Sequence, residues 1–190
     1  RIKIIRAIWR AKHNFSHYRK LLLQGLTPQE AFDCLDTGHE PQSGEDTASI
    51  RLAVLGYPYS LYDNYISVGL LEKLKSYGIS VVTPEMVPER ELRRMSKNLP
   101  KNLFWYYSNR VVWSCMYFLQ KQSVDGVVHV TAFGCGPDAM TNKLVELETK
   151  YNTRKIPFLT VTIDEHTGEA GVATRVEAFV DLIRRKKGMM

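Results

Sequence analysis

The chain has 190 residues, of which 44% are hydrophobic and 24% are charged. This composition is ordinary for a folded globular protein, and it excludes disorder as the default state of the chain. No segment holds the roughly 18 consecutive apolar residues that a membrane-spanning helix requires, and the basic N-terminal segment lacks the uninterrupted apolar run of a signal peptide. We therefore expect no membrane association and one main domain with a small appendage.

The net charge is +6 and the sequence pI is about 9.2. The excess of Lys and Arg lies largely near the two ends, in residues 1–12 and 184–187. Charge in such positions usually forms a solvated face or a tail. A nucleic-acid partner is therefore only the third of our hypotheses. A phosphate-bearing small molecule or an acidic partner protein would suit this charge equally well.

Residues 1–47 predict a helical N-terminal extension followed by a linker. An apolar residue recurs every three or four positions in the first part of this segment, which is typical of one stripe of an amphipathic helix that needs a packing partner. The stripe consists of Ile4, Ile8, Ala11, Phe15, Tyr18 and Leu22. Gly25 ends this helix, and the capping box from Thr27 to Glu30 begins a second helix that runs to about Leu35. The polar residues 37–46 then form a linker.

Residues 48–190 predict an α/β lobe, because apolar strands alternate with amphipathic helices. Strands are predicted at 50–55, at 79–82, from 127 to the loop at Cys135, and at 158–163. Helices are predicted from about 64 to 77, at 89–97, at about 103–122, at 137–151 and at about 169–185. This alternation indicates parallel strands joined by helical crossovers. We predict an open, mostly parallel four-stranded sheet in a three-layer, flavodoxin- or Rossmann-like fold with strand order 2-1-3-4.

Ligands of such sheets bind beyond the carboxyl ends of the strands, where the strand order reverses. Three loops should meet there, at 56–64, 133–138 and 164–168. The first loop contains neither GxGxxG nor GxxxxGK, so a dinucleotide fingerprint and an ATP-binding phosphate loop are both missing. Its tyrosines either line an aromatic pocket or pack beneath the following helix. The pocket residues that we expect from this loop are Gly56, Tyr57, Tyr59 and Asn64.

The second loop carries Cys135 between two glycines. Pro137 suits the first helical position, and Asp138 then lies in the first turn, where a negative charge is favoured. Cys135 would therefore face unpaired backbone N–H groups and the positive end of a helix dipole, which favour the thiolate that binds metals. Gly134 and Gly136 would permit close backbone approach. The alternative is a tight strand-to-helix turn that simply contains a small residue.

The third loop places two carboxylates and an imidazole at a strand end, in Asp164, Glu165 and His166. Such a group can bind a metal, move protons or orient a ligand. The alternative is a polar turn with ordinary helix-start chemistry. Elsewhere, we interpret His129 as a satisfied core histidine and Cys115 as a core residue.

The chain has three cysteines, Cys34, Cys115 and Cys135. Their wide spacing and odd number disfavour a disulfide framework and favour a reducing cytoplasm. No CxxC pair is present. Since one copy of the chain cannot provide four thiolates, any cluster would need other ligands or another subunit.

Four segments of the chain resemble one known family. They lie at 56–63, 133–138, 156–171 and 175–179, and they look like the acyl-CoA dehydratase activase-related proteins, which are relatives of the 2-hydroxyacyl-CoA dehydratase and benzoyl-CoA reductase subunits. The resemblance covers about 50–183. It implies an iron–sulfur protein of anaerobes, with a 4Fe–4S cluster, in which Cys135 matches a cluster-ligand position and an ATP-hydrolysing activator donates electrons.

Our leading hypothesis is an iron–sulfur or cluster-docking lobe in low-potential electron transfer to an acyl-CoA or similar substrate. It would be a lobe or subunit of a 2-hydroxyacyl-CoA dehydratase-like or reductase-like enzyme, with Cys135 as an iron ligand and with Asp164 and His166 lining the neighbouring pocket. Its partners would be an ATP-dependent activator or reductase protein and a further cluster-bearing lobe or subunit. The second hypothesis is a non-catalytic module without its own cluster, which binds an anionic ligand or assembles subunits.

Overall fold

The computed structural model describes residues 2–39 and 48–189. Most of the predicted linker at 37–46 therefore lies outside the described residues. The elements in chain order are α1 (Ile2–Leu23), α2 (Pro28–Thr37), β1 (Ile50–Leu55), α3 (Pro58–Tyr62), α4 (Leu70–Ser76), β2 (Ile79–Val82), the 3₁₀ helix η1 (Pro84–Met86), α5 (Glu89–Met95), the 3₁₀ helix η2 (Ser96–Asn98), α6 (Tyr106–Gln120), β3 (Gly126–Ala132), α7 (Gly136–Lys150), β4 (Phe158–Ile163) and α8 (Glu169–Lys186).

The four strands form one parallel sheet in the order β2-β1-β3-β4, which confirms the predicted topology. The order reverses between β1 and β3, which are neighbours in the sheet although β2 lies between them in the chain. Their register pairs Leu52 with Gly126 and Leu55 with His129. The carboxyl ends of β1, β3 and β4 therefore lie on one edge of the sheet, which we call the rim.

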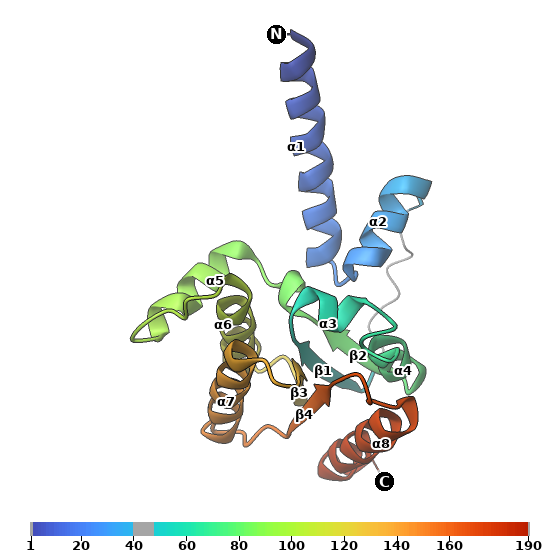
Figure 1. The fold of residues 1–190 in the computed structure, drawn as a ribbon, viewed down its shortest axis with the longest axis vertical. Helices are drawn as coiled ribbons and strands as arrows, with labels where there is room; N and C mark the ends of the chain where they lie inside the picture. The colour runs from blue at the N-terminus through green and yellow to red at the C-terminus, as the bar shows by residue number, and fades with distance from the viewer. Residues whose placement is uncertain (1, 40–47, 190) are drawn as a thin grey trace.

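Helices cover both faces of the sheet, as predicted for a three-layer fold (Figure 1). Helices α3, α4 and α8 pack on one face, and α5, α6 and α7 pack on the other. Side chains of β1 alternate between the two cores: Leu52 and Val54 join the first, and Ala53 and Leu55 join the second. Because both faces are covered, β1 is apolar at every position except Arg51 and does not alternate between apolar and polar residues.

The stretch after β1 differs from the prediction: α3 lies within the predicted loop at 56–64, and the helix predicted from about 64 begins only at Leu70, as α4. The Oδ1 atom of Asp63 accepts hydrogen bonds from the backbone N–H groups of Tyr65 at 2.9 Å and Ile66 at 3.0 Å. Such side-chain capture of N–H groups favours a turn over a helix. Val68 and Gly69 then adopt φ of 47° and 66°, left-handed values through which a right-handed helix cannot continue.

Two other predicted boundaries were wrong by three residues. Strand β3 ends at Ala132 and not at Cys135. Helix α6 begins at Tyr106 and not near Leu103, because the Asn109 side chain binds both the N–H and the C=O of Leu103, at 2.8 Å and 2.7 Å. These bonds hold the segment before α6 in a non-helical conformation.

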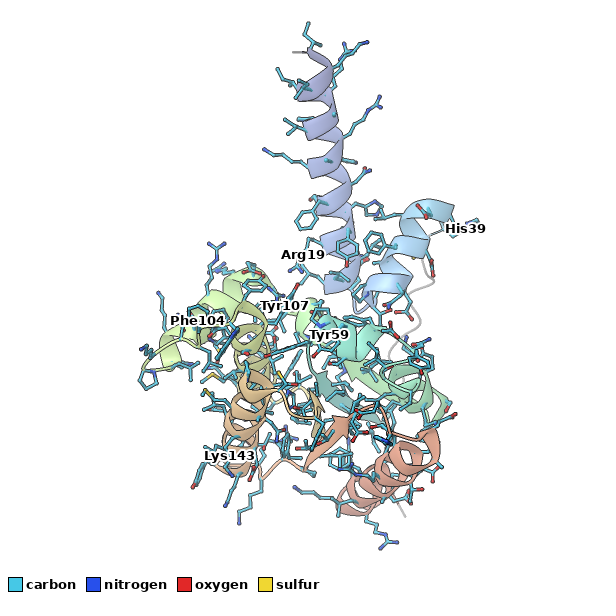
Figure 2. The ribbon with its side chains drawn as sticks, viewed as in Figure 1. Arg19, His39, Tyr59, Phe104, Tyr107 and Lys143 are labelled. Atoms are coloured by element: carbon cyan, nitrogen blue, oxygen red, sulfur yellow. The ribbon has the colours of Figure 1, made fainter. Side chains whose placement is uncertain are left out.

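Helices α1 and α2 form a hairpin beside the α/β layers, and α1 projects far beyond them (Figure 1). The predicted capping box is confirmed, since the Thr27 side chain accepts from the N–H of Glu30 and the Glu30 carboxylate accepts from the N–H of Thr27. Only the C-terminal end of α1 is buried, at Leu21 and Leu22, which pack against Ala31 of α2. Arg19 attaches this end to the lobe by donating to the C=O of Glu85 at 3.3 Å (Figure 2).

Candidate functional site

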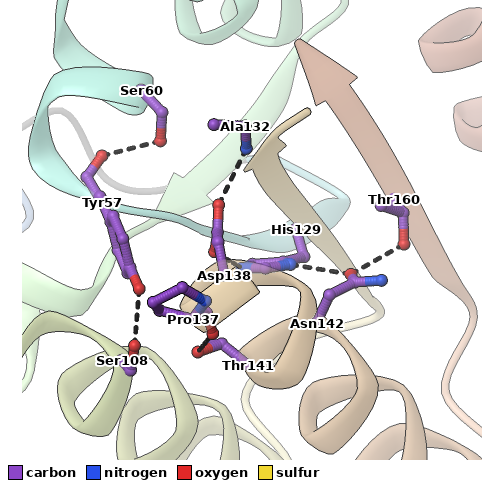
Figure 3. Close-up of polar contacts among 10 residues, drawn as sticks. All are labelled: Tyr57, Ser60, Ser108, His129, Ala132, Pro137, Asp138, Thr141, Asn142 and Thr160. Carbon is purple, nitrogen blue, oxygen red and sulfur yellow. Dashed lines mark hydrogen bonds and ion pairs between the residues drawn. The ribbon is translucent and has the colours of Figure 1, made fainter. Parts of the chain in front are cut away.

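A buried polar network lies directly beneath the rim, between β3 and α7 (Figure 3). His129 of β3 and Asp138 of α7 are 0% and 1% exposed. The Nε2 atom of His129 lies 3.5 Å from Oδ1 of Asp138. The other carboxylate oxygen, Oδ2, accepts a hydrogen bond from the N–H of Ala132 at 2.9 Å. Asp138 therefore connects the first turn of α7 to the end of β3, across the loop that carries Cys135.

The network continues toward β4 through Asn142. Its Oδ1 atom contacts Nδ1 of His129 at 2.8 Å and accepts from the Thr160 hydroxyl at 3.0 Å. Since an amide oxygen can only accept, Nδ1 of His129 carries a proton, and the neutral ring presents the Nε2 lone pair to Asp138. Burial lowers the pKa of His129, although the Asp138 charge acts in the opposite direction.

The interpretation of His129 as a satisfied core histidine was only half right. The ring is in the core, but neither its Nε2 nor Oδ1 of Asp138 has a hydrogen-bond partner among the described residues. Sequence reasoning missed this pairing and also missed Asn142 and Thr160. A usable signal was the i, i+4 spacing of Asp138 and Asn142, which places both on the helix face that packs on the sheet.

Tyr57 and Tyr59 extend from the end of β1 over this network. The Tyr57 hydroxyl lies 2.6 Å from the Ser108 hydroxyl of α6, and its ring lies 6.1 Å from that of Tyr59. Burial raises the pKa of both tyrosines, and the charges of Asp138 and Cys135 raise it further. The first two predicted loops therefore meet at the rim. Tyr57 packs against the core on the α5, α6 and α7 side of the sheet. Tyr59, labelled in Figure 2, is half exposed.

Cys135 lies in an open groove of about 410 Å³ between β3, β4 and α7. The groove is lined by hydroxyl, amide and apolar groups, in Thr131, Ala132, Phe133, Gly134, Cys135, Gly136, Ala139, Asn142, Thr160 and Thr162. The thiol is partly exposed at the N-terminus of α7, as the sequence predicts. A Cβ at Gly134 or Gly136 would meet no protein atom within 4 Å, so both glycines leave open space beside the thiol, and Gly134 has φ of 73°.

The third loop borders a different cavity, of about 720 Å³, on the α4 and α8 side of the sheet. Tyr59 and Asn64 line it together with Asp164, so these three predicted pocket residues come together. The Oδ1 atom of Asp164 is engaged within its own turn by the Thr167 hydroxyl and the N–H of His166, and these bonds lower the pKa of Asp164. The two cavities share only Ala132 in their linings.

Four predicted pocket residues lie outside the linings of both cavities: Gly56, Tyr57, Asp138 and His166. His166 is largely exposed and contacts Glu165 at 3.5 Å. Gly56 is a packing residue, since a Cβ there would lie 2.9 Å from the Ser60 hydroxyl and 3.0 Å from the C=O of Val130. The glycine therefore lets α3 approach β3 closely.

The three thiols lie apart from one another. Cys34 is on α2, and Cys115 is fully buried in the α6 core, where burial raises its pKa. Across residues 2–39 and 48–189, no three His, Cys, Asp or Glu side chains are grouped closely enough to hold a metal ion. Because iron–sulfur clusters are held mainly by several thiolates, Cys135 can contribute one ligand but cannot complete a set. The described residues alone do not fit a resident cluster.

Residues 1–87 match the family model of the CoA enzyme activase uncharacterised domain. The chain carries a CoA enzyme activase-related domain. This match confirms the resemblance to the acyl-CoA dehydratase activase-related family that the sequence motifs predict. No curated protein matches the chain.

The activase-related match and the predicted resemblance overlap in residues 50–87. The match begins with α1 and α2 and ends at the start of the loop before α5, so the helical hairpin belongs to the matched region. An activase-related domain suggests a partner enzyme in general terms. In the described part of the chain, no helix is both long enough and apolar enough to cross a membrane.

Proposed function

We propose that this chain is a docking lobe of an activase-related system, which presents Cys135 as a single thiolate to the iron–sulfur cluster of a partner. The observation that carries the proposal is the position of this thiol. It is partly exposed in an open groove at the rim, while the thiols of Cys34 and Cys115 lie on other elements. One thiolate suits a shared cluster, because the remaining ligands would come from the partner.

The local structure supports a thiolate at this position. Cys135 is the N-cap residue of α7, a helix of 15 residues, and no side chain caps the N-terminal N–H groups. These groups and the positive end of the helix dipole stabilise a nearby negative charge. The only carboxylate in the first turn, Asp138, points inward to Ala132 and His129, away from the groove.

In this proposal, a cluster shared between Cys135 and the partner would supply low-potential electron transfer toward an acyl-CoA or similar substrate. The residues of this chain would hold the thiolate in place and shape the surface around it. An ATP-dependent activator would be the electron donor, in a reducing cytoplasm.

A synthetic 4Fe–4S cluster with exchangeable small thiolate ligands tests this role. Cys34→Ser removes the other partly exposed thiol, so the comparison is between Cys34→Ser and the double variant Cys34→Ser/Cys135→Ser. We expect the single variant to retain iron and sulfide after anaerobic gel filtration, and the double variant to lose at least nine tenths of both. Equal iron in the two variants would remove Cys135 from the proposed role.

A further inference from the structure

The apolar stripe of α1 is covered at one end and uncovered along the rest. Its members recur with alternating spacings of four and three, which is the a/d pattern of a coiled-coil seam. The final seam residue, Leu22, is 2% exposed against α2. Ile4, Ile8 and Phe15, earlier in the same seam, are 63%, 52% and 63% exposed. The seam therefore continues for about two heptads beyond the part that α2 covers.

The charges of α1 are of one sign. The helix from Ile2 to Leu23 contains no Asp or Glu. Its basic residues are Lys3, Arg6, Arg10, Lys12, Arg19 and Lys20. Like charges three or four positions apart destabilise a helix, and positive charges in the first turns oppose its dipole. The uncovered part of α1 therefore has no electrostatic support of its own, and nearby negative charges would stabilise it.

We propose that the uncovered seam of α1 binds an acidic amphipathic helix of a partner protein. The seam continues an existing helix–helix interface, and its heptad spacing matches a helical occupant. The charge determines which helix would fit: Lys12 flanks the seam beside Phe15 and Ala11, so carboxylates on the flanks of the occupant would pair with it. A second copy of this chain would bring two sets of like charges together.

This inference concerns the helical hairpin and is independent of the role proposed for Cys135. The occupant would lie beyond the C-terminal end of α2, alongside the projecting part of α1 (Figure 1). It would cover Ile4, Ile8 and Phe15 at its centre. The loop that carries Cys135 would remain free, so either proposal can fail while the other holds.

The probe is a synthetic peptide of three heptads, with Leu at a and d and Glu at e and g. Its Glu residues keep it from pairing with itself. A matched peptide with Lys in place of Glu is the comparison. We expect the acidic peptide to bind the full chain in isothermal titration calorimetry with at least tenfold higher affinity than the basic peptide. Its affinity should fall as the salt concentration rises from 50 to 500 mM, because dissolved ions screen the attraction between the Glu residues of the peptide and the basic residues of α1.

Two exposed substitutions on α1 separate the seam from general charge effects. Ile8→Asp places a carboxylate on the seam, whereas Ser16→Asp places the same charge outside it. We expect Ile8→Asp to weaken the acidic peptide at least tenfold and Ser16→Asp to weaken it less than threefold. Equal binding of both peptides, or equal effects of both variants, would overturn the proposal. It would also be overturned if the chain bound anionic lipid vesicles but no peptide, or if it associated with itself in sedimentation.

Discussion

The Cys135 groove and the Asp164 cavity lie on the two sides of the rim and share only Ala132 in their linings. The two sides differ in what their carboxylates bind. On the α7 side, Asp138 is buried, bonded to the backbone of β3, and adjacent to His129. Within the described part of the chain, Oδ1 of Asp138 and Nε2 of His129 have no hydrogen-bond partner. On the α4 and α8 side, Asp164 is exposed, and its hydrogen bonds close a turn with Thr167 and His166. Both carboxylates follow a strand end, yet only one connects two elements.

This difference separates two uses of a carboxylate that look alike in sequence. A buried carboxylate that accepts a backbone bond from a neighbouring element fixes the relative position of the two elements, so its removal leaves a donor unpaired. An exposed carboxylate in a local turn keeps water as an alternative partner. The side that holds Cys135 is therefore built on a buried network, and the side with the larger cavity is bordered by a self-contained turn.

The largest effect is expected when Asp138 is removed. Asp138→Ala should lower the free energy of unfolding by about 1–3 kcal/mol, because the N–H of Ala132 loses its acceptor. Asp138→Asn should cost less, since an amide retains an acceptor for Ala132 and offers a donor to the neutral His129 ring. Urea denaturation followed by far-UV circular dichroism measures both changes.

The matched control is Asp164→Ala on the other side of the rim. We expect its unfolding midpoint to stay close to that of the unchanged chain, because the residue is exposed and its bonds are local. If both alanine variants lost the same stability, the distinction between a connecting and a self-contained carboxylate would be wrong.

A smaller effect is expected from pH, through His129. Burial lowers the pKa of the folded-state ring below that of the unfolded chain, which is about 6.5. The unfolded state therefore binds the proton first, so the contribution of the neutral ring is complete above pH of about 6.5 and is lost as the pH falls toward the folded-state pKa. One such group changes stability by at most about 1.4 kcal/mol per pH unit.

The contribution of His129 can be isolated by measuring urea midpoints from pH 8 down to pH 5 on the unchanged chain and on the His129→Gln variant. The difference in stability between the two proteins should shrink steadily as the solution becomes more acidic. A difference that grew with acidity would mean that His129 is charged in the folded state and paired with Asp138.

The sequence predicted the strands and the capped start of α2, because these depend on patterns within one segment, and it predicted the strand order from the succession of elements along the chain. Apolar runs such as 50–55 stand out from their surroundings, and the capping box from Thr27 to Glu30 lies within four residues. The alternation of strands and helices then leaves few topologies. The position of the Cys135 loop at the rim followed from that topology.

The parts that were missed depend on contacts or conformations that no single segment reveals. The break between α3 and α4 needs left-handed values at Val68, a residue that rarely adopts them. The pairing of His129 with Asp138 needs the depth at which α7 packs on β3. The periodic pattern of apolar residues also does not predict that the Cys135 groove is separate from the Asp164 cavity, or that α1 is exposed.

The smallest predicted effect concerns the two glycines beside Cys135, which look equivalent in the sequence. Gly134 has φ of 73°, and Gly136 begins α7 without a positive φ. Gly134→Ala should cost about 1 kcal/mol, because a Cβ is disfavoured in the left-handed region. Gly136→Ala should leave stability unchanged or raise it by about 0.5 kcal/mol, since alanine reduces the freedom of the unfolded chain. Thermal denaturation of the two variants distinguishes these signs, and a cost at Gly136 equal to that at Gly134 would show that the loop, not the dihedral angle at one residue, requires glycine.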